Sequence, residues 1–128
     1  MRAELQLLGA AVIIGLVHLF WAAAESRAQQ GYRWAAGPRD EARPVTGRAA
    51  RLNRAFANYL ETLPLFAAAV GAAAAGGKLG LLTLWGAHAY VWSRALYVPA
   101  YAFGWPVRPL LWFISIGGLL AVTAAIFI

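Results

Sequence analysis

The sequence predicts an all-α membrane protein, a four-transmembrane-helix bundle that forms a single domain over residues 1–128. Hydrophobic residues make up 62% of the chain and charged residues only 12%, whereas soluble domains are roughly 45–50% apolar and about 25% charged. Four apolar stretches follow one another, each close to the roughly 20 residues that a helix needs to cross a bilayer. A length of 128 residues indicates one domain.

The first span is predicted at residues 5–24, where His18 is the one ionisable side chain. The apolar core of a cleaved signal peptide is shorter, roughly 7–15 residues. We therefore expect a retained helix. The segment that follows, residues 25–46, is predicted as a loop, because Pro38 and Pro44 disfavour a continuous helix there.

The other spans are predicted at residues 50–75, 79–101 and 107–128, the second of the four helices starting near Gly47. Residues 76–78, Gly-Gly-Lys, predict a tight turn. Residues 104–106, Gly-Trp-Pro, separate the last two helices, because proline lacks a backbone donor and disfavours helix just before it. Small residues at 70–77 and at 117–118 indicate close helix packing.

Basic residues are concentrated between the first span and the core of the second. Nucleic-acid binding is one interpretation of such a cluster, but both flanking segments are predicted spans, and basic residues collect in cytoplasmic loops. We therefore expect no nucleic-acid partner, the first and third loops in the cytoplasm, and both termini on the opposite side. Seven of the eleven basic residues belong to this cluster: Arg27, Arg33, Arg39, Arg43, Arg48, Arg51 and Arg54.

A polar stripe follows one face of the second predicted span. Arg51, Arg54, Asn58 and Glu61 stand at spacings of three, four and three residues, which place them on one side of a helix. An unpaired carboxylate in a membrane costs a few kcal/mol, so we expect Glu61 to face the protein interior and to have a partner. The stripe either locks helices together or binds a charged small molecule, and intramembrane ionisable groups favour binding.

A second stripe lies on the third predicted span. Arg94, Tyr97 and Tyr101 share a face, and Arg108 follows beyond the Gly-Trp-Pro break. The alternative interpretation is an interfacial belt whose arginines extend to the lipid headgroups.

Cysteine is absent, so any thiol chemistry must use a thiol from the substrate. His18 and His88 have no carboxylate or second histidine at ligand spacing. We expect both to be packing residues and predict no metal site.

The segment containing the first stripe resembles the signature of the MAPEG superfamily, the membrane-associated proteins in eicosanoid and glutathione metabolism. That pattern is Arg, three residues, Asn, two residues, Glu, two residues, Pro, one residue, Phe, and it is matched by Arg54, Asn58, Glu61, Pro64 and Phe66. The second stripe has the spacing of the glutathione-using members. The resemblance covers the whole chain and is greatest to the short bacterial members.

The resemblance implies a homotrimer in the bacterial inner membrane, with glutathione or another low-molecular-weight thiol as co-substrate bound between neighbouring subunits. Tyr97 and Tyr101 would reach the thiol from the neighbour, and Arg108 would be catalytic, near the sulfur. Thr62 departs from the tyrosine of several members, and Pro109 could redirect Arg108. The glutathione-binding residues implied are Arg51, Arg54, Asn58, Glu61, Arg94, Tyr97 and Tyr101.

The leading hypothesis is a glutathione-dependent transferase or peroxidase acting on a lipophilic small molecule that enters from the membrane lipids. The second is a non-catalytic, lipid-binding or scaffold member of the same superfamily. The third is a small multidrug-type transporter. Such transporters carry their essential carboxylate in the first helix, and residues 5–24 contain none.

Overall fold

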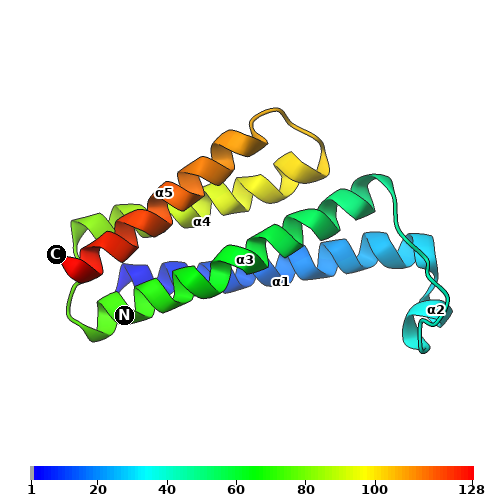
Figure 1. Ribbon diagram of the computed structural model, residues 1–128, viewed down its shortest axis with the longest axis horizontal. Coiled ribbons are helices and arrows are strands. Elements are labelled where there is room, and N and C mark those ends of the chain that lie inside the picture. The colour runs from blue at the N-terminus through cyan, green and yellow to red at the C-terminus, as the bar shows by residue number, and fades with distance from the viewer. Residues whose placement is uncertain (1) are drawn as a thin grey trace.

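A computed structural model describes residues 2–128, and within that range the regular secondary structure is entirely helical (Figure 1). Four long helices and one short helix follow in the order α1 (Ala3–Gln30), α2 (Tyr32–Ala36), α3 (Gly47–Ala75), α4 (Leu81–Ala102) and α5 (Arg108–Phe127).

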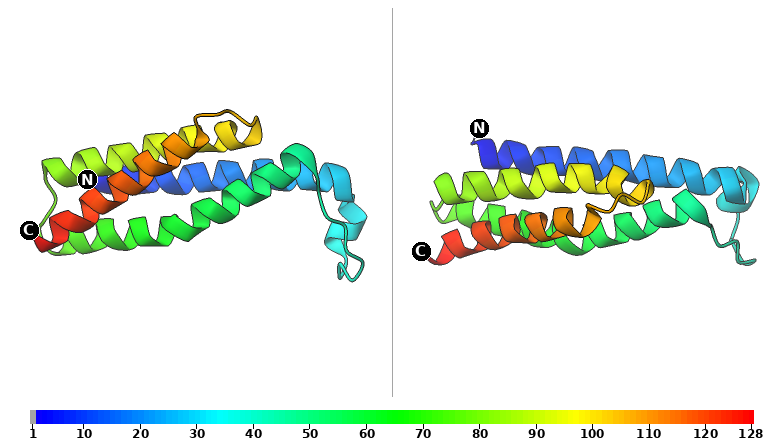
Figure 2. Two further views of the ribbon diagram at one scale, coloured as in Figure 1. Left: turned by 45° about the horizontal axis from the view of Figure 1, so that its top comes forward. Right: turned by 90° about the horizontal axis from the view of Figure 1, so that it is seen from above.

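The long helices form an up-and-down bundle (Figures 1 and 2). Both termini and the α3–α4 turn lie at one end, whereas α2 and the α4–α5 turn lie toward the other. The first and third connections therefore share an end of the bundle, while the side of the membrane on which they lie stays a prediction. Helices α1 and α3 have 28 and 29 residues, against 22 in α4 and 20 in α5, so they extend beyond the α4–α5 turn.

The segment predicted as a loop is more ordered than expected. Helix α1 continues past residue 24 to Gln30, and α2 follows at once, which corrects the prediction of a loop over residues 25–46. Side chains in the last turn of α1 bind the rest of the connection. Gln29 exchanges two hydrogen bonds of 2.9 Å with the backbone of Thr46, and the Gln30 amide donates to the Arg43 carbonyl at 2.8 Å.

The two predicted turns are present. Helix α3 begins at Gly47 and ends at Ala75 as the sequence predicts, and Gly77 turns the chain toward α4 with a φ of 69°. Gly104 has the same φ of 69° in the break between α4 and α5. Left-handed backbone is sterically open to glycine and disfavoured for other residues, so these positions end the helices.

Helices α4 and α5 approach each other closely at a pair of glycines, Gly86 and Gly118. A Cβ atom added to Gly86 would lie 2.8 Å from the Gly118 carbonyl oxygen, so only glycine fits at this crossing. In the other half, the Tyr59 hydroxyl donates to the Ala11 carbonyl and joins α3 to α1. The ring of Phe66 stacks on Tyr90 at 4.0 Å between centroids, which connects α3 to α4.

The outer surface of the bundle is apolar. Among residues 2–128, α1 and α5 are the helices long and apolar enough to cross a membrane, and only 17% and 28% of their most apolar windows are buried. Large contiguous apolar surfaces mark membrane or protein contacts. Helices α3 and α4 carry the polar stripes and fall short of the same test, so their spans stay predictions. More than half of the surface is exposed for several large apolar side chains: Phe20, Trp85, Trp92, Phe113 and Leu120.

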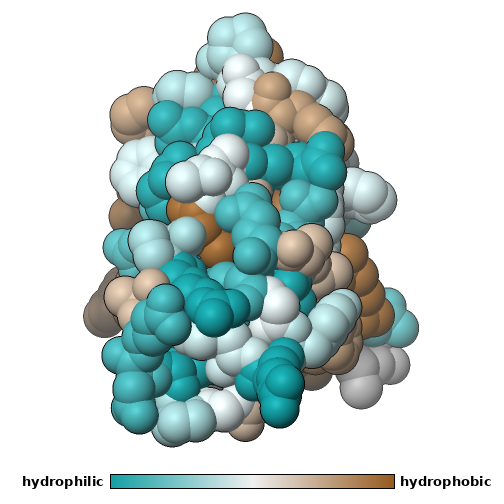
Figure 3. Space-filling view, turned by 90° about the vertical axis from the view of Figure 1, so that its right-hand side faces the viewer, coloured by the Kyte–Doolittle hydropathy of each residue, from teal (hydrophilic) through white to brown (hydrophobic). Residues whose placement is uncertain are grey.

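The end of the bundle that carries α2 differs from its sides. Viewed from that end, the surface is mostly hydrophilic, with apolar side chains toward its edges (Figure 3). The connection between α1 and α3, which holds much of the predicted basic cluster, lies at this end.

Candidate functional site

The two polar stripes meet within one chain. The Arg94 guanidinium donates from Nη1 to Asn58 Oδ1 at 2.9 Å, and Arg54 donates from Nε to the Tyr101 hydroxyl at 3.3 Å. The short turn after α3 returns α4 antiparallel along it, so the two striped faces come together. Within one chain, Tyr97 and Tyr101 thus lie on the face of α4 that meets the α3 stripe. The contact of these tyrosines with a thiol held by a neighbouring subunit stays a prediction.

Arg94 is the most deeply placed charge in this cluster. It is fully buried, and its guanidinium carbon lies 4.3 Å from the centre of the Tyr97 ring and 5.3 Å from that of Tyr59. Arginine is attracted to the faces of aromatic rings, and burial strengthens the attraction. Its Nε and Nη2 atoms are buried without a hydrogen-bond partner among residues 2–128. Arg94 therefore does not extend to the headgroups, which rules out the belt interpretation at this position.

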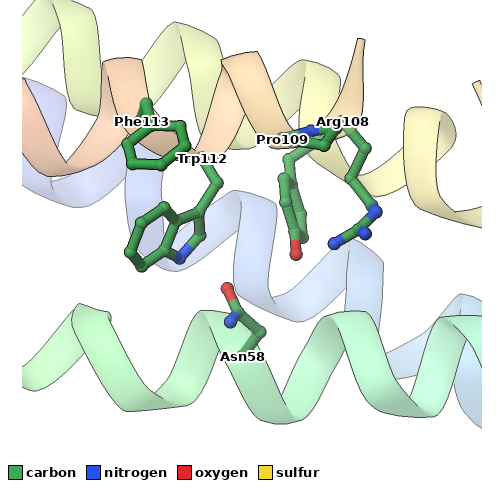
Figure 4. A pocket seen from close by; sticks show the side chains of 6 residues that line it. Asn58, Arg108, Pro109, Trp112 and Phe113 are labelled. Atoms are coloured by element: carbon green, nitrogen blue, oxygen red, sulfur yellow. The ribbon is translucent and has the colours of Figure 1, made fainter. Parts of the chain in front are cut away.

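A pocket of about 170 Å³ opens between α3, α4 and α5 beside this cluster. Figure 4 shows Asn58 pointing from α3 toward side chains that descend from α5. The pocket combines one cation, one amide and aromatic surface, and none of its described lining residues is acidic. The residues that line it are Asn58, Tyr97, Arg108, Pro109, Trp112 and Phe113.

Arg108 begins α5 and reaches into this pocket (Figure 4). Pro109 fits the first turn of the helix, where a missing backbone donor costs nothing, so the departure noted in the sequence leaves Arg108 aimed at the site. Its guanidinium carbon lies 4.7 Å from the centre of the Tyr101 ring. It forms no ion pair within residues 2–128. A guanidinium fork with unused donors suits a carboxylate or thiolate ligand.

Five of the eight predicted site residues do not line the pocket: Arg51, Arg54, Glu61, Arg94 and Tyr101. Arg54, Arg94 and Tyr101 lie beside it in the contacts given above. Arg51 donates from Nε to the Ala102 carbonyl at 2.9 Å, so it ties the last turn of α4 to α3. Glu61 is exposed on α3 and makes no hydrogen bond or ion pair with any residue in 2–128. The expectation that Glu61 faces the interior and has a partner is therefore wrong for the single chain, because α3 is uncovered on that side.

The two histidines have packing contacts. His18 is fully buried, with Nε2 3.1 Å from the Leu52 carbonyl oxygen and its ring against Phe56. His88 accepts a hydrogen bond from Trp92 Nε1 at 3.1 Å. Within residues 2–128, no group of three potential ligands is placed to hold a metal ion.

The aromatic wall of the pocket was missed by sequence reasoning. Trp112 and Phe113 come from α5, which the sequence predicts only as a membrane span with no part in the site. The available signal was spacing, because Trp112 stands one helical turn after Arg108 and shares its face.

Comparisons with known proteins identify the family of the chain. No curated protein matches the chain. No solved structure matches it either. The MAPEG family matches residues 6–128, essentially the whole sequence. The chain therefore belongs to the MAPEG family and is a membrane protein of that family.

Proposed function

We propose that this protein is a glutathione-dependent transferase or peroxidase that acts on lipophilic electrophiles. The observation that carries the proposal is the pocket between α3, α4 and α5, where Arg108 and Asn58 meet beside the buried cation of Arg94. Family membership supports the same chemistry, since the family is associated with glutathione. The apolar outer surface supports access for a lipophilic substrate from the bilayer.

Glutathione carries two carboxylates, one ammonium group and a thiol, and the cluster offers cations, an amide and an anion as partners for these groups. Arg54 is exposed with unused donors beside Tyr101, so it suits a carboxylate through a bidentate pair. Asn58 adds amide hydrogen bonds, and Glu61 is the nearby anion for the ammonium group. Another low-molecular-weight thiol with the same charges would fit the same groups.

Arg108 is the proposed catalytic residue. A guanidinium beside a thiol favours the thiolate, the reactive nucleophile, and lowers the thiol pKa. The thiol proton leaves to water, and the sulfur forms a bond to the electrophilic carbon as that carbon's leaving group departs. With a peroxide, the thiolate sulfur attacks the terminal peroxide oxygen, the O–O bond breaks, and the alkoxide takes a proton from water and leaves as an alcohol. A second thiol then attacks the resulting sulfenic acid, water leaves, and a disulfide forms. Tyr97, Asn58 and Arg54 would position the thiol.

A homotrimer is proposed as the working assembly. Glu61 and Arg54 are exposed on a helix flanked by apolar surface, and an uncompensated carboxylate in the membrane costs a few kcal/mol. A second copy packed against this side of α3 would cover both charges, and the bound thiol would neutralise them. We place the four long helices across the bacterial inner membrane with the α2 end in the cytoplasm.

Binding of glutathione to the purified chain in detergent tests the proposal. Ligand at ten times its Kd should raise the free energy of unfolding by about 1.4 kcal/mol. Arg108→Ala should keep most of that shift but lose the ultraviolet absorbance of the thiolate. Arg33→Ala is the matched control, because Arg33 is exposed in α2 and lies outside the pocket. Absence of stabilisation at millimolar glutathione with an intact oligomer would refute the binding role.

A non-catalytic, lipid-binding or scaffold member is the second candidate. This candidate is favoured because polar residues of the stripes already bond to other parts of the same chain. Asn58 accepts a hydrogen bond from Arg94, and Arg51 donates one to the last turn of α4. Such a protein would bind glutathione without forming thiolate, or not at all. Equal thiolate absorbance in the wild type and in Arg108→Ala would favour it.

A further inference from the structure

We propose that a second pocket, between α1, α3 and the connection after α2, binds the headgroup phosphate of an anionic phospholipid. This α1–α3 pocket has a volume of about 260 Å³ and lies at the end of the bundle that carries α2. It is separate from the site above, to which α1 contributes no lining residue.

The α1–α3 pocket is apolar on one side and polar on the other. Leu19 and Ala22 line it from the predicted span of α1, and Phe56 lines it from α3. One turn further along α1, Ser26 and Arg27 line it just beyond the predicted end of the span at residue 24. This order matches a phospholipid at the membrane boundary, with glycerol and upper acyl chain against apolar side chains and phosphate among polar ones.

Two guanidinium groups reach the pocket without a carboxylate. Arg27 uses Nη1 for the Gln30 side-chain oxygen at 2.6 Å, and Arg39 uses Nε for the Ala35 carbonyl at 2.9 Å. Both are left with further donors, and neither forms an ion pair within residues 2–128.

Two of the three carboxylates near the pocket are used elsewhere, and the third, Asp40, is exposed and does not line it. Glu25 pairs with Arg48 at 2.6 Å and Glu41 with Arg43 at 3.8 Å. None of the described lining residues of the α1–α3 pocket is acidic. The two arginines therefore leave a net positive charge in the pocket, which an anion would neutralise.

The backbone at Arg39 is the second independent observation. Arg39 is the one non-glycine residue within 2–128 that has a positive φ, 58°. Residues other than glycine rarely adopt this conformation, and such strain clusters at ligand sites. The Ala35 carbonyl and the Trp34 ring, 5.6 Å from the guanidinium carbon, hold the side chain. The strained backbone of the connection is thus found at Arg39, the residue whose guanidinium group is the second cation in the pocket.

A membrane lipid is the occupant that these features favour. Basic pockets between membrane helices bind anionic headgroups, and the cytoplasmic leaflet, which the proposed orientation assigns to this end, is the anionic one. Glutathione lacks the acyl chain that the apolar side would receive. Asn53 of this pocket and Asn58 of the thiol site are five residues apart on α3, a rotation of about 140°, so the two pockets use different faces.

Native mass spectrometry of the full chain, released from micelles containing phosphatidylglycerol or phosphatidylcholine, tests the assignment. We expect the wild type to retain phosphatidylglycerol in preference. Arg27→Gln and Arg39→Asn should each lower that retention roughly fivefold, since each removes one headgroup contact. Asparagine tolerates the left-handed backbone, so Arg39→Asn removes charge without adding strain. Arg33→Gln, which removes the same charge from α2 outside the pocket, should retain the lipid.

Three results would overturn the proposal. Equal losses in Arg39→Asn and Arg33→Gln, in variants whose thermal unfolding matches the wild type, would indicate diffuse surface charge. Displacement of the lipid by glycerol 3-phosphate at equal concentration would assign the pocket to a free phosphate ester. Weaker glutathione binding in Arg39→Asn, with unchanged phosphatidylglycerol retention, would assign it to the thiol site. Failure of the glutathione proposal alone would leave the lipid result unaffected.

Discussion

Replacing Gly118 with alanine is expected to destabilise the bundle, whereas the same change at its neighbour Gly117 is not. A Cβ atom on Gly118 would lie 2.8 Å from the Tyr90 backbone nitrogen and 3.1 Å from the Ala89 Cβ, and closer still to the Gly86 carbonyl oxygen. Two of these three are backbone atoms, which have no rotamer to change. At Gly117 an added Cβ meets nothing within 4 Å.

The expected changes in the free energy of unfolding follow from the different room for a Cβ atom at the two positions. Overpacking a filled interface costs about 1–3 kcal/mol, and a methyl group against fixed backbone belongs near the upper value. Alanine at Gly117 should change stability between about 0 and +1 kcal/mol, because it favours helix over glycine. The two variants should therefore differ by about 3 kcal/mol or more, although they add the same atoms at adjacent positions.

Reversible unfolding in mixed micelles, titrated with sodium dodecyl sulfate and followed by far-ultraviolet circular dichroism, measures both variants. Glutathione binding gives a second readout, because α4 carries Tyr97 and α5 carries Arg108, so forcing these helices apart should widen the pocket in Gly118→Ala alone. Equal stability of the two variants would refute the account of the Gly86–Gly118 crossing.

Two other perturbations follow from contacts described above. Asn58→Ala leaves the Arg94 Nη1 donor without its acceptor and should cost about 1–3 kcal/mol of stability in the same titration, whereas Asn58→Asp, which keeps the oxygen and adds a countercharge, should cost less. The Arg48 hydrogen bond holds the pKa of Glu25 below its usual 4.5. Because the folded pKa is the lower one, this contribution is complete above pH 4.5 and is lost as the pH falls through the folded pKa. Unfolding titrations above and below that pH should show that acid lowers the free energy of unfolding of the wild type by this contribution, which Glu25→Gln lacks.

Local sequence features predicted the helices and turns. The bounds of α3 and the breaks at Gly77 and Gly104 agree with the structure because apolar length and glycine conformation act within a few residues. Helix α2 was missed, since five residues hold too little pattern to separate helix from loop. The glutamine side chains that order the connection bind across 13 and 17 residues, a pairing that no local spacing encodes.

Helical periodicity predicted the faces of the site but not which faces meet. It placed Asn58 and Arg94 on polar stripes, yet their contact depends on how α4 returns along α3. Helical periodicity also does not show whether another helix packs against a given helix face. Glu61 shares the stripe with Asn58 but is exposed, although α3 contacts α4 on both sides of it, at Asn58 and at Phe66.

The unequal lengths of the helices create a step at the cytoplasmic end of the proposed topology. Helix α3 is seven residues longer than α4 (29 against 22), and at about 1.5 Å per residue this is a difference of about 10 Å. The α4–α5 turn, and with it Arg108, therefore sits below the rim set by α1 and α3. For the proposed reaction, this recess is a place that both substrates can reach. A water-soluble thiol can descend into it from above while a lipophilic partner arrives from the side, and neither has to leave its own solvent to react.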